Sequence, residues 1–250
     1  RNMNRCLLVT GGGRGIGAEV SRKAVKLGYS VCINYLKNKT SAENLVDELN
    51  SKGNRAFVCQ ADVSKEEEVV GLFERFEEQF GVPDALVNNA GVLDLQTRVD
   101  QMSAERIQGI FSVNVTGSFL CAREAVKRMS TRYGGKGGSI VNLSSGAAKY
   151  GSPGEYVDYA ASKAAVDTLT TGLAREVAEE GIRVNAVRPG FIETEIHAAG
   201  GEPNRMERVR PMVPMKRVGK PREVADAVLW LLSDEASYIT GTILDVSGGR

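Results

Sequence analysis

Short apolar runs alternate with amphipathic stretches along the whole chain. The apolar runs lie at residues 5–10, 31–33, 56–59, 85–87, 139–143, 182–187 and 242–246. Between them, apolar residues recur three or four positions apart, as on one face of a helix, at residues 16–27, 41–49, 64–80, 103–132, 157–180 and 223–232. Because the runs are apolar throughout rather than alternating, they predict strands that are covered on both faces. The pattern therefore predicts an α/β fold with a doubly wound parallel sheet and crossover helices.

Local signals refine the ends of these elements. Ser64 and Ser103 are of the residue type preferred at helix N-caps and are expected to begin the third and fourth helices. Gly28 follows the first helix and is expected to end it in the left-handed conformation. The glycine-rich stretch 134–138 is expected to be a surface turn, and the irregular, proline-containing stretch 190–220 a substrate-binding lid.

The length of the chain sets its domain organisation. A chain of 250 residues is long enough for one well-buried core and short for two separate domains. We therefore expect residues 1–250 to form a single dinucleotide-binding domain, with the lid at 190–220 as part of it.

Charge and cysteine usage exclude several classes of partner. Lys and Arg total 32 and Asp and Glu total 31, and a net charge of +1 argues against nucleic acid or a membrane surface as a partner. No apolar run approaches the length of a membrane span, and no signal peptide is recognisable, so a cytoplasmic location is expected. The cysteines are widely spaced and form no cluster with the only histidine, so they indicate free thiols and no metal site: Cys6, Cys32, Cys59 and Cys121.

The first strand and the first helix are joined by a glycine-rich loop, TGGGRGIG, at residues 10–17. Glycine lets the backbone approach a pyrophosphate closely, and the helix N-terminus presents free N–H groups to it. A tight turn without a ligand is the alternative, but the position after the first strand of a βαβ unit favours a dinucleotide site. The expected cofactor-binding residues of this loop are Gly11, Gly13, Arg14, Gly15, Ile16 and Gly17.

The charges after the second strand favour NADP(H) over NAD(H). An NAD site normally places an acidic residue about 20 residues beyond the loop, on the ribose 2′-hydroxyl. Here no acid occurs between Glu19 and Glu43, whereas Arg14 and Lys37 offer positive charge to a 2′-phosphate. Ordinary solvated charges are the alternative, and NAD(H) stays possible.

Tyr159 and Lys163 lie four residues apart on one predicted helix face. The spacing is weak evidence alone, but other polar and glycine residues gather at or after the ends of the predicted strands, where open α/β sheets bind ligands. They are the NNAG sequence at 88–91, Ser144 and Ser145, and Pro189 and Gly190, with Asn114 in the long helix.

With these motifs, nearly the whole chain resembles the short-chain dehydrogenase/reductase family. The resemblance implies a Rossmann-type sheet of seven strands in the order 3-2-1-4-5-6-7. It implies Tyr159 as general acid/base, Lys163 as the group that lowers its pKa and binds the nicotinamide ribose, and Ser145 as the hydrogen-bond partner of the substrate oxygen. Asn114 would belong to a proton relay. Further cofactor contacts would come from Tyr35, Asp62, Val63, Asn88, Ala90, Gly91, Pro189, Gly190, Ile192 and Thr194.

Tyrosine has an ordinary pKa near 10, so a neighbouring cation and a positive nicotinamide ring would be needed to bring Tyr159 toward neutrality. Adjacent strand residues point to opposite faces, so only one of Ser144 and Ser145 can face the site, and we expect Ser145. Glu155 and Tyr156 are candidates for the substrate wall.

The predicted function is an NADP(H)-dependent oxidoreductase that interconverts a small carbonyl compound and an alcohol. Alternatives are a non-catalytic NADP sensor, a sugar dehydrogenase and a 3-oxoacyl thioester reductase. The last could dock an acidic carrier protein on the basic helix end formed by Arg123, Lys127, Arg128 and Arg132. The resemblance also implies a homotetramer, or a dimer, assembled through the two long helices and the last strand.

Overall fold

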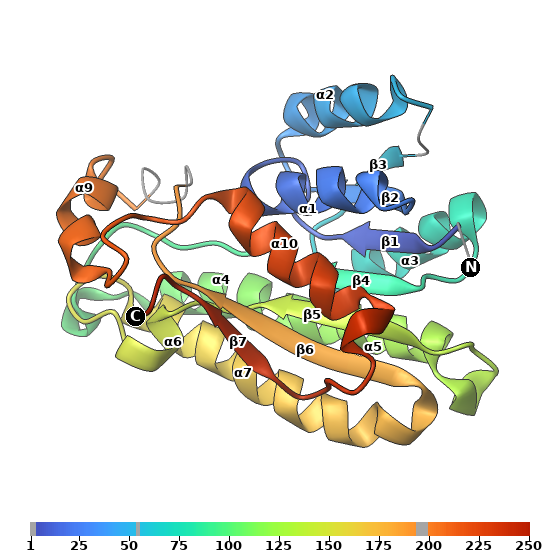
Figure 1. Cartoon of the computed structure of the whole chain (residues 1–250). Coiled ribbons are helices and arrows are strands. Elements are labelled where there is room, and N and C mark those ends of the chain that lie inside the picture. The colour runs from blue at the N-terminus through green and yellow to red at the C-terminus, as the bar shows by residue number, and fades with distance from the viewer. Residues whose placement is uncertain (1–3, 54–55, 194–199) are drawn as a thin grey trace.

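The computed structural model describes residues 4–53, 56–193 and 200–250, and contains one parallel sheet of seven strands (Figure 1). The strand order is β3-β2-β1-β4-β5-β6-β7, which confirms the predicted order. The strands are β1 (Cys6–Val9), β2 (Ser30–Tyr35), β3 (Ala56–Gln60), β4 (Ala85–Asn88), β5 (Gly138–Leu143), β6 (Ile182–Pro189) and β7 (Ile243–Val246).

Helices cover both faces of the sheet, as predicted for strands that are apolar throughout (Figure 1). One face carries α1 (Gly15–Lys26), α2 (Lys39–Asn50) and α10 (Pro221–Leu232). The other carries α3 (Glu66–Phe80), α4 (Ala104–Phe111), α5 (Gly117–Met129) and α7 (Val157–Val177). Successive strand residues divide between two hydrophobic cores: Leu7 and Val9 of β1 face the first set of helices, whereas Cys6 and Leu8 face the second.

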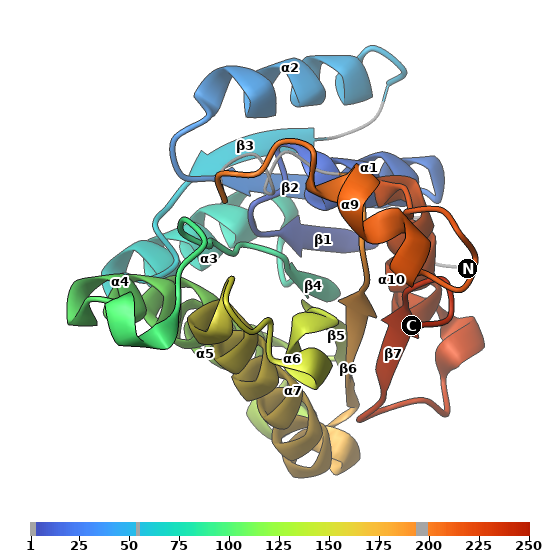
Figure 2. The same ribbon diagram turned by 90° about the vertical axis from the view of Figure 1, so that its left-hand side faces the viewer.

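The connections that leave the carboxyl ends of the strands gather at one edge of the sheet, which Figure 2 views from the front. The short helix α9 (Arg205–Val209) lies over this edge (Figure 2). The described part of the stretch 190–220, residues 190–193 and 200–220, is less irregular than the sequence suggested, because it contains α9 and the 3₁₀ turn Arg210–Met212.

The long helix predicted at 103–132 is divided in the structure. Ser103 caps its start, as predicted, by accepting a hydrogen bond from the N–H of Arg106 at 3.1 Å. A π-helical turn, Ser112–Thr116, then separates α4 from α5. An inserted turn of this kind is frequent at functional sites, and it contains Asn114.

One expectation about local structure needs correction, and one element was missed. Ser64 does not cap α3, because its hydroxyl donates to the Asp62 carboxylate at 2.6 Å and α3 starts only at Glu66. The short helix α6 (Ala147–Tyr150) was not predicted.

The glycine-rich stretch 134–138 forms the expected turn, but Gly135, Gly137 and Gly138 are also closely packed. A Cβ at Gly137 would lie 2.4 Å from the carbonyl oxygen of Gly181, and the φ of Gly137 is +85°. The four cysteines are buried free thiols, as the sequence indicated. Among the residues that the structure describes, no helix has the length and apolar character required to cross a membrane.

Candidate active site

A cleft of about 1530 Å³ runs along the carboxyl edge of the sheet, from the glycine loop to α9. This volume exceeds the roughly 300–1,000 Å³ of a typical small-molecule site, so it can hold a dinucleotide and a further ligand. Most predicted site residues line it: Gly11, Gly13, Arg14, Gly15, Ile16, Tyr35, Lys37, Asp62, Val63, Ala90, Gly91, Ser145, Glu155, Tyr156, Tyr159, Lys163, Pro189, Gly190 and Ile192. Gly17, Asn88 and Asn114 are not in the lining, and Thr194 lies outside the described residues.

Gly17 lies beneath the glycine loop rather than in the cleft wall. A Cβ at Gly17 would lie 2.5 Å from the carbonyl oxygen of Gly11 and 2.6 Å from Nδ2 of Asn89. Real Cβ atoms do not approach other atoms so closely, so only glycine permits the loop to fold back on the start of α1. Gly17 therefore supports the loop and does not face the cleft.

Three side chains that sequence reasoning did not assign hold the glycine loop. Asn34 accepts from the N–H of Gly11 at 3.2 Å, and its amide group donates to two carbonyls at the end of β3. Thr10 accepts from the N–H groups of Asn89 and Ala90, both at 3.0 Å. Asn89 in turn donates to the carbonyl of Gly11 at 2.9 Å. The ends of β2 and β4 thus fix the loop from both sides.

Asn88 is placed differently from the sequence expectation. Its side chain is buried and donates to the carbonyl of Ser118 at 3.2 Å and to Oδ1 of Asn142 at 3.0 Å. It therefore ties β4 to β5 and α5, and the neighbouring Asn89 lines the cleft instead. The two adjacent asparagines could not be ranked from the sequence, because the sequence does not show that β4 ends at Asn88.

The loop and α1 fit a bound pyrophosphate. The α1 N-terminus is not capped by a side chain, and its first turn contains no acid, so its N–H groups and the positive end of its dipole remain for an anion. Further along the cleft, the end of β2 contributes Tyr35, Leu36, Lys37 and Asn38, none of them acidic. The side chain of Asn38 caps α2 by accepting from the N–H of Ser41.

Tyr159, Lys163 and Ser145 converge in the middle of the cleft. Lys163 is buried, its ammonium donates to the carbonyl of Leu143 at 2.8 Å, and it lies 5.7 Å from the centre of the Tyr159 ring. The Ser145 hydroxyl interacts with Tyr159, whereas Ser144 is buried and donates to the carbonyl of Lys163 at 3.3 Å. Ser145 is thus the serine of this pair that faces Tyr159.

Burial dominates the electrostatics of this group. It raises the pKa of Tyr159 above its ordinary value, and the hydrogen bond from Ser145 and the charge of Arg205 offset only part of the increase. Burial also lowers the pKa of Lys163 to about 8, with the carboxylate of Asp167 acting in the opposite direction. The lowered pKa that the sequence led us to expect for Tyr159 depends on a positive nicotinamide ring as well as on Lys163, so it stays a prediction for the enzyme with bound cofactor.

Asn114 is buried behind the cleft wall. It lies in the π-helical turn, and its side chain faces the loop that follows β4, which we call the cleft loop. Its Oδ1 accepts from the N–H of Val92 at 2.8 Å, and its Nδ2 donates to the carbonyl of Val92 at 2.9 Å and to the hydroxyl of Ser162 at 3.1 Å. The side chain thus joins the cleft loop at Val92 to α7.

The far end of the cleft combines charged and aromatic groups from α9 and the segment before α7. Arg205 donates to the carboxylate of Glu155 at 2.9 Å, and its guanidinium lies 5.0 Å from the ring centre of Phe191 and 5.9 Å from that of Tyr156. Arg208 also lines the cleft and pairs with Glu155 at 3.6 Å. Glu155 and Tyr156 were expected here, but no motif in the sequence pointed to the two arginines.

Comparison with known proteins places the chain in a family. A family model described as enoyl-(acyl carrier protein) reductase matches residues 11–250. The chain belongs to the short-chain dehydrogenase/reductase family. It is therefore an enzyme of the NAD(P)-dependent oxidoreductase class, as the resemblance implied.

Several members of this short-chain dehydrogenase/reductase family are similar over their full length. The chain is 55% identical over 243 residues to the Escherichia coli protein called uncharacterized oxidoreductase YgfF, covering 97% of this chain and 98% of that protein. It is 37% identical to the 3-oxoacyl-[acyl-carrier-protein] reductase FabG of Staphylococcus epidermidis, covering 99% of each chain. It is also 37% identical to glucose 1-dehydrogenase 2 of Bacillus subtilis, covering 97% of this chain and 93% of the relative.

A solved structure of a family member superposes closely. The 3-ketoacyl-(acyl-carrier-protein) reductase from Brucella melitensis, complexed with NADH, matches with a TM-score of 0.91 at 33% identity, covering 98% of both chains.

The buried ammonium of Lys163 predicts a pH-dependent stability. Its pKa is about 8 in the folded chain and 10.5 ordinarily, so between these values the unfolded chain binds more protons and stability rises with pH. Below pH 8 the cost of burying the charge is fully present. Relative to Lys163→Met, the wild type should gain up to about 3 kcal/mol of unfolding free energy between pH 8 and 10.5. Denaturant titrations of both proteins across this range measure the difference, and a flat difference would contradict the burial of a charged Lys163.

Proposed function

We propose that the chain is an NADP(H)-dependent reductase of a small carbonyl compound, with Tyr159 as the acid/base. The observation that carries the proposal is the convergence of Tyr159, Lys163 and Ser145 in the same cleft as the glycine loop. In the direction of reduction, the Tyr159 hydroxyl donates a proton to the substrate oxygen, which the Ser145 hydroxyl holds by a second hydrogen bond. When bound, the nicotinamide supplies the hydride.

The raised pKa of Tyr159 suits the proton donor in this direction, since the phenol is then protonated at neutral pH. Lys163 keeps its charge at neutral pH, because its pKa of about 8 lies above 7. Its ammonium would bind the ribose hydroxyl groups next to the nicotinamide and stabilise the tyrosinate that forms when the proton leaves. A non-catalytic sensor does not need a charged lysine that stabilises a tyrosinate, so the cleft supports an enzyme better than a sensor.

Removal of the Tyr159 hydroxyl should remove the acid and leave the fold. Tyr159→Phe is expected to lower kcat by at least about 100-fold, in line with the contribution of a positioned general acid. The assay follows NADPH consumption across a panel of aldehydes and ketones, with Tyr133→Phe, an exposed position outside the cleft, as the matched control. Equal turnover by wild type and Tyr159→Phe would overturn the mechanism.

Selectivity for NADP(H) is proposed to come from Arg14 and Lys37. Both line the cleft, one in the glycine loop and one just after β2, and the end of β2 offers no carboxylate that would repel a 2′-phosphate. The NADH in the Brucella melitensis relative belongs to that protein, and the preference of this chain is a matter of its own side chains.

The double variant Arg14→Ala/Lys37→Ala tests this proposal. We expect the KM for NADPH to rise about 10-fold to 100-fold, because two charge-assisted hydrogen bonds are lost, with the KM for NADH nearly unchanged. Steady-state kinetics with each cofactor gives both values. A wild-type enzyme that prefers NADH, or a variant that loses affinity equally for both, would refute the role of the two residues.

The substrate is proposed to be a small carbonyl compound recognised under the lid at 190–220. Relatives at the same 37% identity are named for a 3-oxoacyl thioester and for glucose, so the names alone favour neither. The basic helix end offers little support for carrier docking. Three of its charges are engaged in ion pairs with Glu66, Glu77 and Glu124, and none of its residues lines the cleft: Arg123, Lys127, Arg128 and Arg132.

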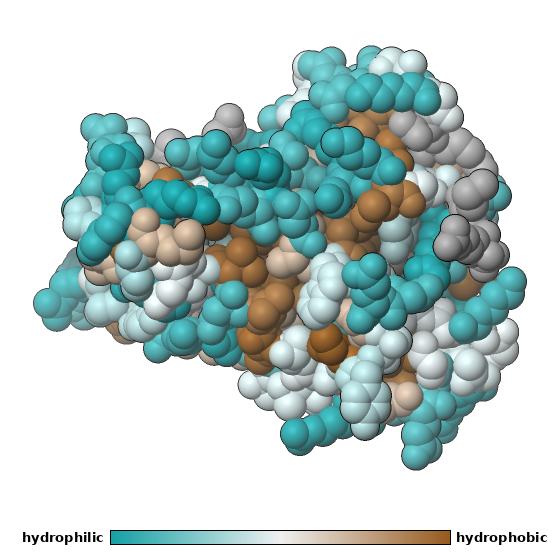
Figure 3. Space-filling model, viewed as in Figure 1, coloured by the Kyte–Doolittle hydropathy of each residue, from teal (hydrophilic) through white to brown (hydrophobic). Residues whose placement is uncertain are grey.

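The chain is also proposed to form a homotetramer, or a dimer. Hydrophobic residues are visible on the face of the molecule where β6 and β7 run (Figure 3), and the apolar residues of β7 are only partly buried. Ile107 of α4 and Phe119 of α5 are 37% and 50% exposed. Sedimentation should therefore give a particle of four or two times the chain mass of 26.9 kDa. A monomer at micromolar concentration would refute the assembly.

A further inference from the structure

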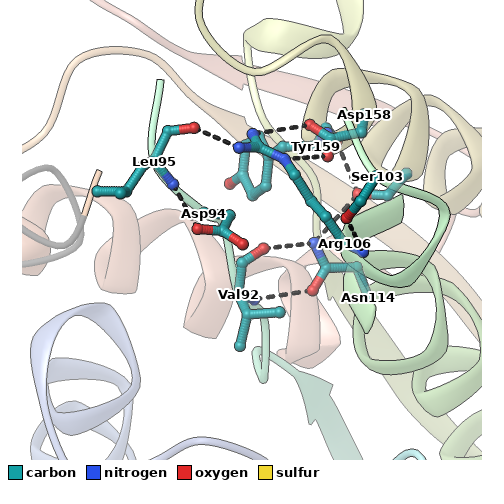
Figure 4. A network of polar contacts seen from close by, with 9 residues as sticks. Val92, Asp94, Leu95, Ser103, Arg106, Asn114, Asp158 and Tyr159 are labelled. Carbon is teal, nitrogen blue, oxygen red and sulfur yellow. Dashed lines mark hydrogen bonds and ion pairs between the residues drawn. The ribbon is translucent and has the colours of Figure 1, made fainter. Parts of the chain in front are cut away.

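A buried ion pair lies next to Tyr159 at the start of α7 (Figure 4). Nε of Arg106, from α4, lies 2.9 Å from Oδ2 of Asp158, and Nη2 lies 3.5 Å from Oδ1. The two side chains are only 10% and 3% exposed. A guanidinium that meets a carboxylate at two points fixes orientation as well as distance.

The Asp158 carboxylate also binds the backbone of the catalytic residue. Its Oδ1 accepts from the N–H of Tyr159 at 2.9 Å. This N–H belongs to the first turn of α7, where backbone donors have no partner within the helix, and the N-cap residue Tyr156 supplies no side-chain acceptor. The carboxylate that Arg106 orients is thus the one that holds Tyr159.

Arg106 connects the catalytic helix to the cleft wall as well. Its Nη1 donates to the carbonyl of Leu95, in the loop after β4 (Figure 4). Val92 and Leu93 of the same loop line the cleft, and Val92 is held by Asn114. One guanidinium therefore joins α4, the cleft loop and the first turn of α7.

We propose that Arg106 is a positioning residue that acts through Asp158 to hold the Tyr159 hydroxyl against Ser145 and the substrate. The proposal rests on the proposed role of Tyr159 as acid/base. Arg106 is not in the cleft lining, so it does not meet substrate or cofactor. Buried ion pairs add little net stability over apolar side chains of the same size, so a role in orientation accounts for this pair better than stability does.

The test compares two buried arginines. Arg106→Gln removes the two-point contact, and Arg128→Gln is the matched control. Arg128 is 15% exposed and pairs with the buried Glu124 of α5, outside the cleft.

Misplacement of a reacting group by about 1 Å can cost about 100-fold in rate. We expect Arg106→Gln to lower kcat about 10-fold to 100-fold with the KM for NADPH changed less than about twofold. Arg128→Gln should lower the melting temperature and leave kcat unchanged.

A kcat within twofold of wild type in Arg106→Gln, with a loss of melting temperature like that of Arg128→Gln, would overturn the proposal and leave a structural ion pair. If Arg106→Gln does not fold, Arg106→Lys takes its place, because it keeps the buried charge and loses the planar fork. It is expected to lose about 10-fold in kcat, and wild-type kcat in Arg106→Lys would equally overturn the positioning role.

A second readout needs no substrate. The absorbance of tyrosinate is titrated at alkaline pH in four proteins: the wild type, Tyr159→Phe, Arg106→Lys and Arg106→Lys/Tyr159→Phe. In each background, subtraction of the curve of the protein without Tyr159 leaves the titration of Tyr159 alone. The pKa of Tyr159 should rise in the Arg106→Lys background, because the hydrogen bond from Ser145 that lowers it is lost. An unchanged pKa refutes the positioning role. Failure of the proposed function looks different, since Tyr159→Phe would then turn over carbonyl compounds like the wild type.

Discussion

The close contact between the glycine loop and the start of α1 is the constraint on which the cleft depends. The loop can pack against the start of the helix only because Gly17 has no Cβ that would clash with the carbonyl of Gly11. That arrangement leaves the uncapped N-terminus of α1 at the carboxyl edge of the sheet. Asn34 and Asn89 then fix the loop between the ends of β2 and β4. The glycine-loop end of the cleft is therefore formed mainly by the backbone, and the nearby side chains hold that backbone in place.

The part of the cleft around Tyr159 and Lys163 follows a different principle, because these groups are ionisable and lie in a buried environment. Burial raises the pKa of Tyr159 above its ordinary value and lowers that of Lys163 to about 8, so it moves the two pKa values apart. Two titratable groups whose surroundings push their pKa values apart are suited to different roles in proton transfer. The ion pair of Arg106 and Asp158 lies one residue from this group but keeps its charge compensated, so it adds rigidity without a net local charge.

Much of the fold could be predicted from the sequence because parallel strands covered on both faces leave an unmistakable apolar signature. The strand order came from family resemblance, since no local pattern specifies which strands are neighbours. What could not be predicted depends on exact turns. Asn88 ends β4 and is buried whereas Asn89 lines the cleft, and the Ser64 hydroxyl binds Asp62 instead of capping α3. The burial of Tyr159, which raises its pKa, could not be predicted either, because only the packed structure reveals it.

The two arginines of α9 contribute to the cleft without contributing to the sheet. Arg205 and Arg208 reach the cleft from a short helix that belongs to no strand of the sheet, and they meet Glu155 across the cleft end. Substitutions of Arg205 and Arg208 would therefore change the charge at this end of the cleft, because both line it, while neither residue belongs to the hydrophobic cores or the glycine loop. In evolutionary terms, α9 is a segment whose charges can diverge without disturbing the sheet.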